Sequence, residues 1–475
     1  MTDRNLLVGP FNRVEGDLEV RLDVRDGAVA AAYTNSPLFR GFEMMMLGKD
    51  PRDALTITPR ICGICSISQS AAAAFALADA AWAEMPDQGM LIAAILHAVE
   101  NLADHLTHFN LFFMPDFARP VYADRTWHDQ AVARFTAQQG SAARDAVTAR
   151  AELLHIVGLL GGKWPHTLAI QPAGVTKAPT LSDKVRIQTA LRSCRRYLET
   201  TLFGAPTEQF AALSARDSLM DWTAGDAGLF LRIAADTGLD DIGMGPGRFM
   251  SFGAYPLPGK RAFAAGMWDG GLHDVDTAQI TEDISHAWML GETAHPADGR
   301  TAPDEDMRDD AYSWCKAPRL NGQTIETGAF ARQIIDGNPL ARDLADRPSA
   351  MARVVGRLIE IARTQMLLED LAAQIDPKDR FMGHWDMPKS GQGQGLVEAA
   401  RGALGHWTKF DNGKITGYQI IAPTTWNFGP RDAAGNPGPL EAALVGAPVG
   451  DGEETPIAVQ HIVRSFDPCM VCTVH

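Results

Sequence analysis

The sequence predicts a mainly α (α+β) protein with a central bundle of long helices and peripheral β-hairpins. Two tight-turn dipeptides, Asp26-Gly27 and Asn412-Gly413, are flanked by alternating apolar and polar residues, and they predict one hairpin near each end of the chain. Between them, four segments repeat apolar residues at intervals of three and four, which indicates a bundle of four long helices. These segments are 92–113, 144–160, 180–203 and 349–374.

The remaining segments are expected to flank or connect these elements. The first hairpin should lie within 16–34, and the second should lie within 406–421 and lead into Pro423–Asn427. Gly, Pro, Asp and Trp are frequent between 249 and 338, which favours irregular structure with short strands. The glycine-rich segment Gly391–Gly395 suggests a loop before a helix.

The composition is that of a globular protein with a large core: 475 residues, 46% hydrophobic and 21% charged. No repeat or long linker divides the chain, so we expect one domain over residues 1–475. The 43 basic and 58 acidic residues give a net charge of −15 and no strongly basic stretch, which argues against nucleic acid or an anionic membrane as a partner. Apolar runs fall short of the roughly 20 residues that span a bilayer, and residues 1–10 lack an export signal. We therefore expect a soluble, cytoplasmic protein.

Four of the six cysteines form two Cys-x-x-Cys pairs, Cys62 with Cys65 and Cys469 with Cys472. Each pair can present two thiolates to a metal, and four thiolates carry the charge that balances two divalent cations. Zinc ribbons usually place their pairs about 15–20 residues apart, whereas here almost the whole chain lies between them. The spacing leaves open a zinc site, an iron-sulfur cluster, another thiolate metal centre, or no shared site.

The motifs around these cysteines resemble a known family. Arg60-Ile-Cys-Gly-Ile-Cys-Ser together with the terminal Asp-Pro-Cys-x-x-Cys-x-x-His is similar to the paired signature of the large subunit of nickel-iron hydrogenases. The resemblance covers almost the whole chain and implies that fold, with the active site formed by both chain ends. Further motifs stand in family order at Asn12–Gly16, Phe39–Glu43, Asp104–Phe109, Gly161–His166, Lys316–Arg319 and Ala422–Asn427.

The resemblance implies a nickel-iron centre that cleaves H2 heterolytically. Cys62 and Cys469 would be terminal nickel ligands, whereas Cys65 and Cys472 would bridge nickel to an iron that carries carbon monoxide and cyanide. Proton transfer would begin at a thiolate, which gives Cys472 a catalytic role, and Glu15 would relay the proton. Outside the family, a glutamate in this position would be expected in a surface ion pair.

Two proline-containing motifs are expected beside the diatomic ligands of iron. Arg319 and the Thr424 hydroxyl match the positions that donate hydrogen bonds to cyanide, and Pro318 and Pro423 match positions that line the same pocket. Arg319 would otherwise be a buried structural arginine. Asp104, at helical spacing with two histidines, is expected either to support the metal ligands or simply to join two helices.

A second ion is implied near the active site. Glu43, the backbone carbonyl of Ile420 and the terminal His475 match the positions that hold Mg2+ or a similar hard cation. Carboxylate, carbonyl and water oxygens suit such an ion.

Three residues depart from the pattern that is usual in catalytic members. Gln69 stands where a histidine is usual and cannot take up a proton near neutral pH, and Ile64 and Phe112 would narrow the route for gas. With the chain end at His475, these features resemble the regulatory, hydrogen-sensing hydrogenases, which turn over slowly and tolerate oxygen. The alternative is a high-turnover uptake hydrogenase. A cofactor-free structural homologue is a third class, which the four intact cysteines argue against.

The resemblance also implies partners. After the four metal ligands, the chain has no cysteines left for an electron relay, so an iron-sulfur small subunit is required. It would form a heterodimer with this chain, alone or as a dimer of heterodimers. In a sensor, a histidine kinase would be the receiver downstream, and H2 is the substrate in either case.

Overall fold

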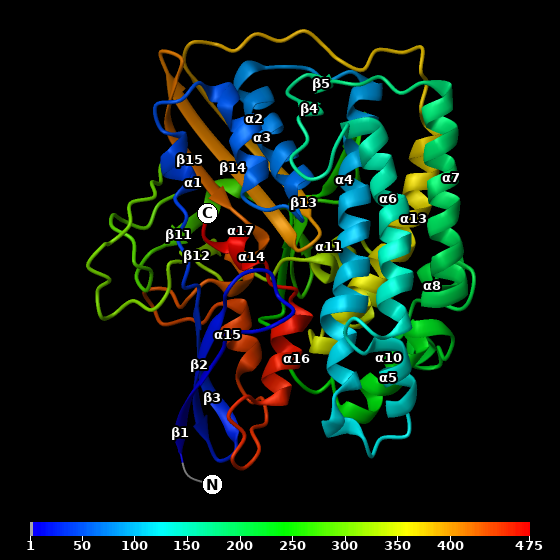
Figure 1. Ribbon diagram of the computed structural model, residues 1–475. Coiled ribbons are helices and arrows are strands. Elements are labelled where there is room, and N and C mark those ends of the chain that lie inside the picture. Colours follow the sequence, from blue (N-terminus) through cyan, green and yellow to red (C-terminus); the bar gives the residue numbers. More distant parts are fainter. Residues whose placement is uncertain (1–2) are drawn as a thin grey trace.

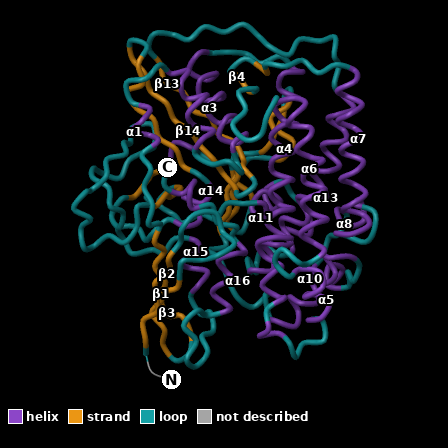
Figure 2. The backbone as a smooth tube through the Cα atoms, in the orientation of Figure 1, coloured by secondary structure: helices purple, strands orange, loops and turns teal. Residues whose placement is uncertain are grey.

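The computed structural model describes residues 3–475, and its long helices gather on one side of the molecule (Figures 1 and 2). Helix α4 packs against α6 and α13, and α7 also packs against α6 and α13, so the four helices close a bundle. The predicted bundle is confirmed. Its helices are α4 (Asp87–Thr107), α6 (Ser141–Gly161), α7 (Leu181–Tyr197) and α13 (Ala350–Gln374).

Local sequence signals set the helix ends. Thr180 begins α7 with a capping box, in which its hydroxyl accepts from the Asp183 amide at 3.1 Å and the Asp183 carboxylate accepts in return. The Ser349 hydroxyl caps α13 with a single hydrogen bond, which it accepts from the amide of Ala352 at 3.1 Å. Helix α4 continues beyond its end as a π-helical turn, His108–Phe113, which is why the apolar seam in the sequence extends so far.

The N-terminal hairpin is confirmed and has a third strand. Strand β2 (Glu19–Arg25) pairs with β3 (Ala28–Asn35) across Asp26-Gly27, which have φ values of 50° and 78°. Positive φ at both positions is what a two-residue hairpin turn requires. Strand β1 (Arg4–Val8) pairs antiparallel with β2.

The second hairpin is likewise part of a three-stranded sheet, β13–β14–β15. Strands β14 (Gly402–Asp411) and β15 (Lys414–Ile421) are joined at Asn412-Gly413 as predicted. The prediction for Gly391–Gly395 was wrong, because this segment begins strand β13 (Gly391–Ala399) and no helix follows it directly.

Alternating glycines explain the error. Helix α3 (Ser66–Ala81), which the sequence patterns did not predict, packs directly on β13. A Cβ atom at Gly395 would lie 1.9 Å from the Ala72 carbonyl, and one at Gly393 would lie 2.2 Å from the Ala76 carbonyl. Glycine is therefore needed at these positions of the strand. The alanines of α3 that face it do not repeat large apolar residues at helical intervals, so the sequence of α3 carries no periodic signal of a helix.

The segment from 249 to 338 has the predicted irregular structure with short strands. Its strands form two- and three-stranded sheets. They are β6 (Arg248–Ser251), β7 (Ala254–Leu257), β8 (Lys260–Phe263), β9 (Gly266–Asp269), β10 (Leu272–His273), β11 (Ile280–Asp283) and β12 (Ala317–Leu320). The other elements of the first 350 residues are α1 (Phe42–Met46), α2 (Ala54–Ile57), α5 (His128–Phe135), β4 (Ile170–Gln171), β5 (Gly174–Val175), α8 (Thr207–Ala211), α9 (Arg216–Met220), α10 (Gly225–Thr237), α11 (Ala329–Ile335) and α12 (Pro339–Asp343).

The C-terminal segment returns to the N-terminal sheet (Figure 1). Apolar residues of β2, including Val20 and Leu22, share one buried cluster with Leu440 and Ile462. Burying these side chains stabilises the contact between sequence regions more than 400 residues apart. The helices of this segment are α14 (Pro423–Phe428), α15 (Pro439–Leu444), α16 (Ile457–Ser465) and α17 (Met470–Thr473).

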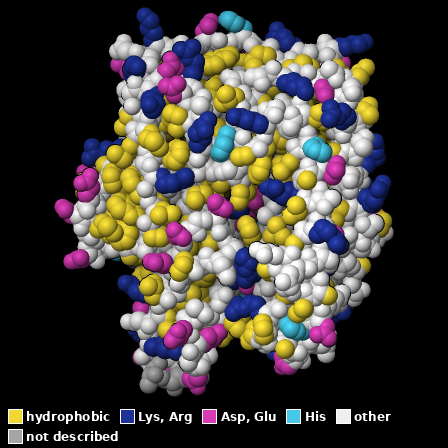
Figure 3. Space-filling model, viewed as in Figure 1, with side chains coloured by type: hydrophobic (Ala, Val, Ile, Leu, Met, Phe, Trp, Pro, Cys, Tyr) yellow, Lys and Arg dark blue, Asp and Glu magenta, His cyan; other side chains and the backbone are white. Residues whose placement is uncertain are grey.

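Basic and acidic side chains are interspersed on the face shown in Figure 3. Within residues 3–475, none of the helices combines the length and apolar character that crossing a bilayer requires.

We predict that Gly395→Ala lowers the free energy of unfolding by about 1–3 kcal/mol, because the added methyl group meets the backbone of α3. Gly417→Ala is the matched control in the same sheet, since the nearest atom to its Cβ would be 3.6 Å away. This control should change stability by less than about 1 kcal/mol. Denaturant unfolding measures both, and equal stability of the two variants would contradict the close packing of β13 on α3.

Candidate metal centre

The four paired cysteines meet in one buried site. The Sγ atoms of Cys62 and Cys469 are 3.5 Å apart, and those of Cys65 and Cys472 are 3.2 Å apart. All four ligand atoms lie within 4.8 Å of one another, and all four residues are buried. The structure therefore favours a single thiolate site shared by both ends of the chain.

The first pair lies between a 3₁₀ turn, Thr58–Arg60, and the start of helix α3. Cys65 is the N-cap of α3, but its side chain does not cap the helix. Instead, Glu100 of α4 accepts hydrogen bonds from the amides of Ile67 and Ser68 at 2.9–3.0 Å. The Trp164 indole donates to the same carboxylate at 3.0 Å. A carboxylate from the bundle thus fixes the backbone directly after Cys65.

Arg40 joins the two pairs. Its guanidinium donates to the carbonyl of Ile61, which precedes Cys62, and to the carbonyl of Val471, which precedes Cys472. The second pair is closed by its own backbone, because the Cys472 amide donates to the Cys469 carbonyl at 3.0 Å. This arginine belongs to the Phe39–Glu43 motif, but sequence reasoning assigned it no role.

Arg401 supplies positive charge beside the thiolates. It is buried and binds Asp104 at 2.7 Å and Asp467 at 3.1 Å. Burial opposes its charge, but these carboxylates, with Cys469 and Cys62, raise the pKa of Arg401 well above its usual value. The pKa of Asp104 is raised to about 7 by burial, although the guanidinium acts against that shift. Asp104 therefore joins α4 to the β13–β14 connection through Arg401, and its support of the metal ligands stays a prediction.

The structure places Arg319 elsewhere. This residue is on β12, and its guanidinium donates to the Asp432 carboxylate at 3.0 Å and to the carbonyls of Pro430 and Asn436. It fixes the loop after α14, as the structural alternative described. Arg401 is the residue that sequence reasoning missed, and it directly follows a segment, β13, that the sequence patterns did not predict as a strand.

Thr424 and the two prolines lie on elements that pack together. The Thr424 hydroxyl accepts from the Cys469 amide at 3.2 Å, which places it against the second cysteine pair. Pro423 is the first residue of α14, where its missing N–H costs nothing. Pro318 is a buried residue of β12, which packs against α14.

The backbone of Glu15 is held by the second cysteine pair. Its amide donates to the Pro468 carbonyl at 3.3 Å, and its carbonyl accepts from the Met470 amide at 2.6 Å. The side chain is half-buried. Burial raises the pKa of Glu15, and the charge of Cys62 adds to this shift. Glu15 is thus partly exposed and lies close enough to Cys62 to feel the charge of its thiolate.

Glu43, Ile420 and His475 lie in contact with one another, and their binding of a cation stays a prediction. The Nε2 atom of His475 lies 2.8 Å from the Ile420 carbonyl and 3.4 Å from the Glu43 carboxylate. Burial acts to raise the pKa of Glu43, but Lys316 and His475 outweigh it and lower this pKa. A cavity of about 20 Å³ lies here, enough for one small occupant. The carboxylate and carbonyl oxygens in this space suit a hard cation, whereas an imidazole nitrogen is an unusual ligand for one.

Gln69 takes part in a buried network. Its Oε1 atom lies 2.8 Å from Nε2 of His406, and Nδ1 of that ring lies 2.9 Å from the Tyr418 hydroxyl. Burial lowers the pKa of His406 to about 3, so its ring is neutral and donates to Gln69. Ile64 is half-buried and packs against the main core, and Phe112 is half-buried in the π-helical turn.

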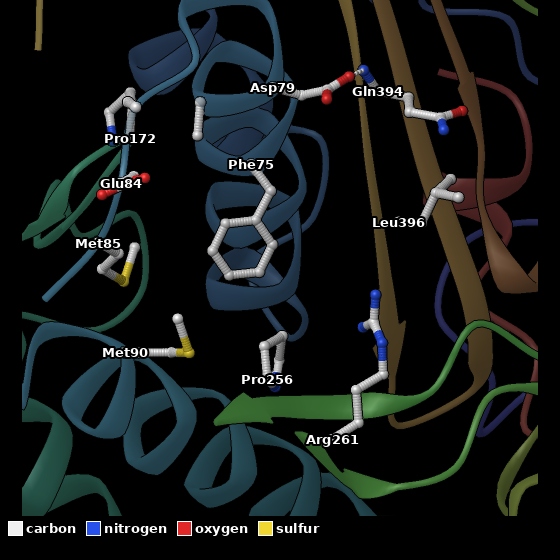
Figure 4. A pocket seen from close by; sticks show the side chains of 12 residues that line it. Phe75, Asp79, Glu84, Met85, Met90, Pro172, Pro256, Arg261, Gln394 and Leu396 are labelled. Atoms are coloured by element: carbon white, nitrogen blue, oxygen red, sulfur yellow. Dashed lines mark hydrogen bonds between the residues drawn. The ribbon is translucent and has the colours of Figure 1, made fainter. Parts of the chain in front are cut away.

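A larger cavity of about 570 Å³ contains none of these residues. It lies toward the end of α3 that is remote from Cys65, with Phe75 central and Arg261 of β8 at one side (Figure 4). It is separate from the thiolate site.

The fold and site define a metalloprotein with a buried centre held by thiolates from both chain ends. The family model described as nickel-dependent hydrogenase matches residues 40–146 and 144–475. The chain belongs to this family, and four soft thiolates within 4.8 Å of one another fit the nickel-iron group.

Known proteins agree over the full length. The chain is 30% identical to the periplasmic NiFeSe hydrogenase large subunit of Desulfomicrobium baculatum, over 98% of this chain and 94% of that protein. It is 28% identical to the uptake hydrogenase large subunit of Rhodobacter capsulatus, over 99% and 95%. The solved, H2-activated NiFeSe hydrogenase of Dm. baculatum superposes with a TM-score of 0.87 at 27% identity, covering 100% of both chains.

These matches confirm the predicted fold and the predicted hydrogenase activity. They do not single out the regulatory type, because the relatives are NiFeSe and uptake enzymes. The cytoplasmic location stays a prediction, since one relative is named as periplasmic.

We predict that Arg401→Met lowers the free energy of unfolding by about 3–5 kcal/mol, because Asp104 and Asp467 are left buried without their cation. Arg52→Met is the control, since Arg52 forms an exposed ion pair with Asp50 and its loss should change stability little. Denaturant unfolding compares the two, and a small loss in Arg401→Met would show that the buried network is not needed for stability.

Proposed function

We propose that this chain is the H2-oxidising large subunit of an uptake-type nickel-iron hydrogenase, an H2:acceptor oxidoreductase. The observation that carries the proposal is the buried set of four thiolates drawn from both chain ends. The relatives of the uptake and NiFeSe types support this assignment over a sensor. The nickel-iron group, with carbon monoxide and cyanide on iron, would supply heterolytic cleavage of H2 when bound.

The residues of the chain would hold this group and move the proton. Cys62 and Cys469 would bind nickel, and Cys65 and Cys472 would bridge it to iron. Thr424 lies against Cys469 and would face the diatomic ligands from α14, with Pro318 and Pro423 nearby.

Proton transfer would pass from the Cys472 thiol to Glu15, whose backbone is fixed to the same segment. Arg401 would offset the negative charge of the thiolates. Arg319 has no place in this mechanism, because its donors bind the loop after α14.

The cation site would be occupied by Mg2+ or a similar ion. Glu43, the Ile420 carbonyl and His475 would bind it, and its charge would help to fix the chain terminus beside Cys472.

Electrons would leave through an iron-sulfur small subunit. Gly63 and Ile64, between the first two cysteines, are partly exposed, so the protein layer over the site is thin at that point. A relay cluster docked there would lie near the metals. A heterodimer, alone or as a dimer of heterodimers, fits this arrangement, and the large-subunit names of the relatives support it.

A hydrogen sensor is the second candidate function. The observation that favours it is Gln69, which holds the neutral His406 by a 2.8 Å hydrogen bond and cannot itself relay a proton. If the protein is a sensor, we expect slow turnover, a cytoplasmic location and a histidine kinase as the receiver. We also expect oxygen tolerance, with Ile64 and Phe112 narrowing the route for gas. Turnover of the purified holoenzyme with a dye acceptor distinguishes the two.

We predict that Cys65→Ser abolishes nickel binding, because a hydroxyl is a much weaker ligand than a thiolate. Cys194→Ser is the control, since Cys194 is buried in α7 away from the cluster. Nickel analysis of the purified holoenzyme should find metal in the control only. Full nickel occupancy in Cys65→Ser would refute the proposed metal centre.

We predict that Glu15→Gln keeps its metals but slows H2/D+ exchange by about 100-fold or more, because an amide cannot relay a proton. Glu19→Gln should exchange at the parental rate, since Glu19 lies on β2 and binds Asn35. Mass spectrometry of the evolved gas measures exchange. Parental exchange in Glu15→Gln would assign the relay to another residue.

A further inference from the structure

Two cavities meet beside the proposed cation site. The inner one, of about 20 Å³, is lined by Glu43, Ile420 and His475. The outer one, of about 400 Å³, has exposed residues such as Glu292 and Arg300 at its rim. We call the outer cavity the vestibule. Glu282 and Lys316 line both cavities, so these two side chains form the wall between them.

The wall consists of one buried ion pair and its partner. The Lys316 ammonium donates to the Glu282 carboxylate at 3.1 Å and to the Gln419 amide oxygen at 2.6 Å. All three residues are buried. The wall is therefore polar and is made of side chains that rotate without moving the backbone.

Gly299 leaves room on the vestibule side of this wall. A Cβ atom there would lie 3.7 Å from both Glu282 Oε2 and Gln419 Oε1, and 3.5 Å from the His295 carbonyl. These are ordinary contact distances, so a side chain would occupy space that is now open. The opening is bordered by carboxylate, amide and carbonyl oxygens, which are the ligands that hard cations prefer.

Part of the lining of the inner cavity is apolar. Phe39 and Trp314 stack there with ring centroids 5.3 Å apart, and Met289 and Val474 are buried beside them. An apolar wall raises the energy of a passing charge. The vestibule is thus the polar approach to Glu43 and His475.

We propose that the vestibule is the route by which a hydrated divalent cation enters and leaves the inner site, with the Glu282–Lys316 pair parting to admit it. This proposal rests on the cation site proposed above. The inner cavity is too small for an ion with its full water shell, so water must be lost at the wall. Glu282 and Gln419 offer oxygens at that point to replace it.

The test blocks the opening without touching an inner ligand. Intact holoenzyme is loaded with Mn2+ and diluted into excess Mg2+, and electron paramagnetic resonance follows the release of Mn2+. Gly299→Leu should slow the release of Mn2+ by about fivefold or more. The leucine side chain would fill the opening, and a packed region moves little to let an ion pass. At equilibrium, Mn2+ should occupy the inner site of this variant to the same extent as in the parent, since Glu43, Ile420 and His475 are unchanged.

Gly271→Leu is the matched control. Gly271 lies in the turn between β9 and β10, where the nearest atom to its Cβ would be 3.8 Å away. Its release rate should match that of the parent. Release from Gly299→Leu at the parental rate, with Mn2+ bound, would overturn the vestibule route alone. A parent that binds no Mn2+ would overturn the cation site and the route together.

A charge reversal at the rim gives a second test that does not depend on packing. Glu292→Lys should slow Mn2+ entry at low ionic strength, and the effect should fade in high salt. Glu454→Lys, at an exposed position outside the vestibule, should leave entry unchanged. If both variants load at the same rate at low salt, the ion does not pass Glu292 and the proposal fails.

Discussion

The structure depends on gathering four thiolates from the two ends of the chain into one buried site. Negative charge at such a site is costly unless positive charge and metal lie close to it. Arg401 provides the charge, and it is held in turn by Asp104 from α4 and Asp467 from the C-terminal segment. The ends themselves are joined by the Arg40 hydrogen bonds and by the backbone of Glu15. A change that separates the ends therefore removes the site, even though the bundle can keep its own core.

The bundle provides the rigid reference for this assembly. Helix α4 presents Glu100 to the start of α3 and, one turn later, Asp104 to Arg401, so one long helix positions both a cysteine backbone and a counter-charge. Residues four apart lie on the same helix face, so one buried face of α4 can hold the start of α3 and also pair with Arg401. The Ala-rich face of α3 then lets β13 approach at backbone distance, and the end of that strand leads directly to Arg401.

Periodic features of the sequence predicted the bundle and both hairpins, because helices with apolar seams and turns with positive φ leave strong local signals. The cysteine pairs predicted the site through their family resemblance, although spacing alone left zinc and iron-sulfur alternatives open. Strand β13 and helix α3 escaped prediction because glycine and alanine packing depends on a partner that no local pattern reveals. The family resemblance directed attention to Arg319 as a donor to the cyanide ligands, whereas the arginine beside the thiolates is Arg401, which is placed there by long-range pairing with Asp104 and Asp467.

His475 links the thiolate site and the proposed cation site. Its Nδ1 atom lies 2.9 Å from the Cys472 carbonyl, and its Nε2 atom lies 2.8 Å from the Ile420 carbonyl. Burial acts to lower the pKa of His475, but the hydrogen bond to Glu43 outweighs it and raises this pKa. A metal ion bound by Nε2 would need that nitrogen unprotonated, so proton and cation would compete for one position beside Glu43.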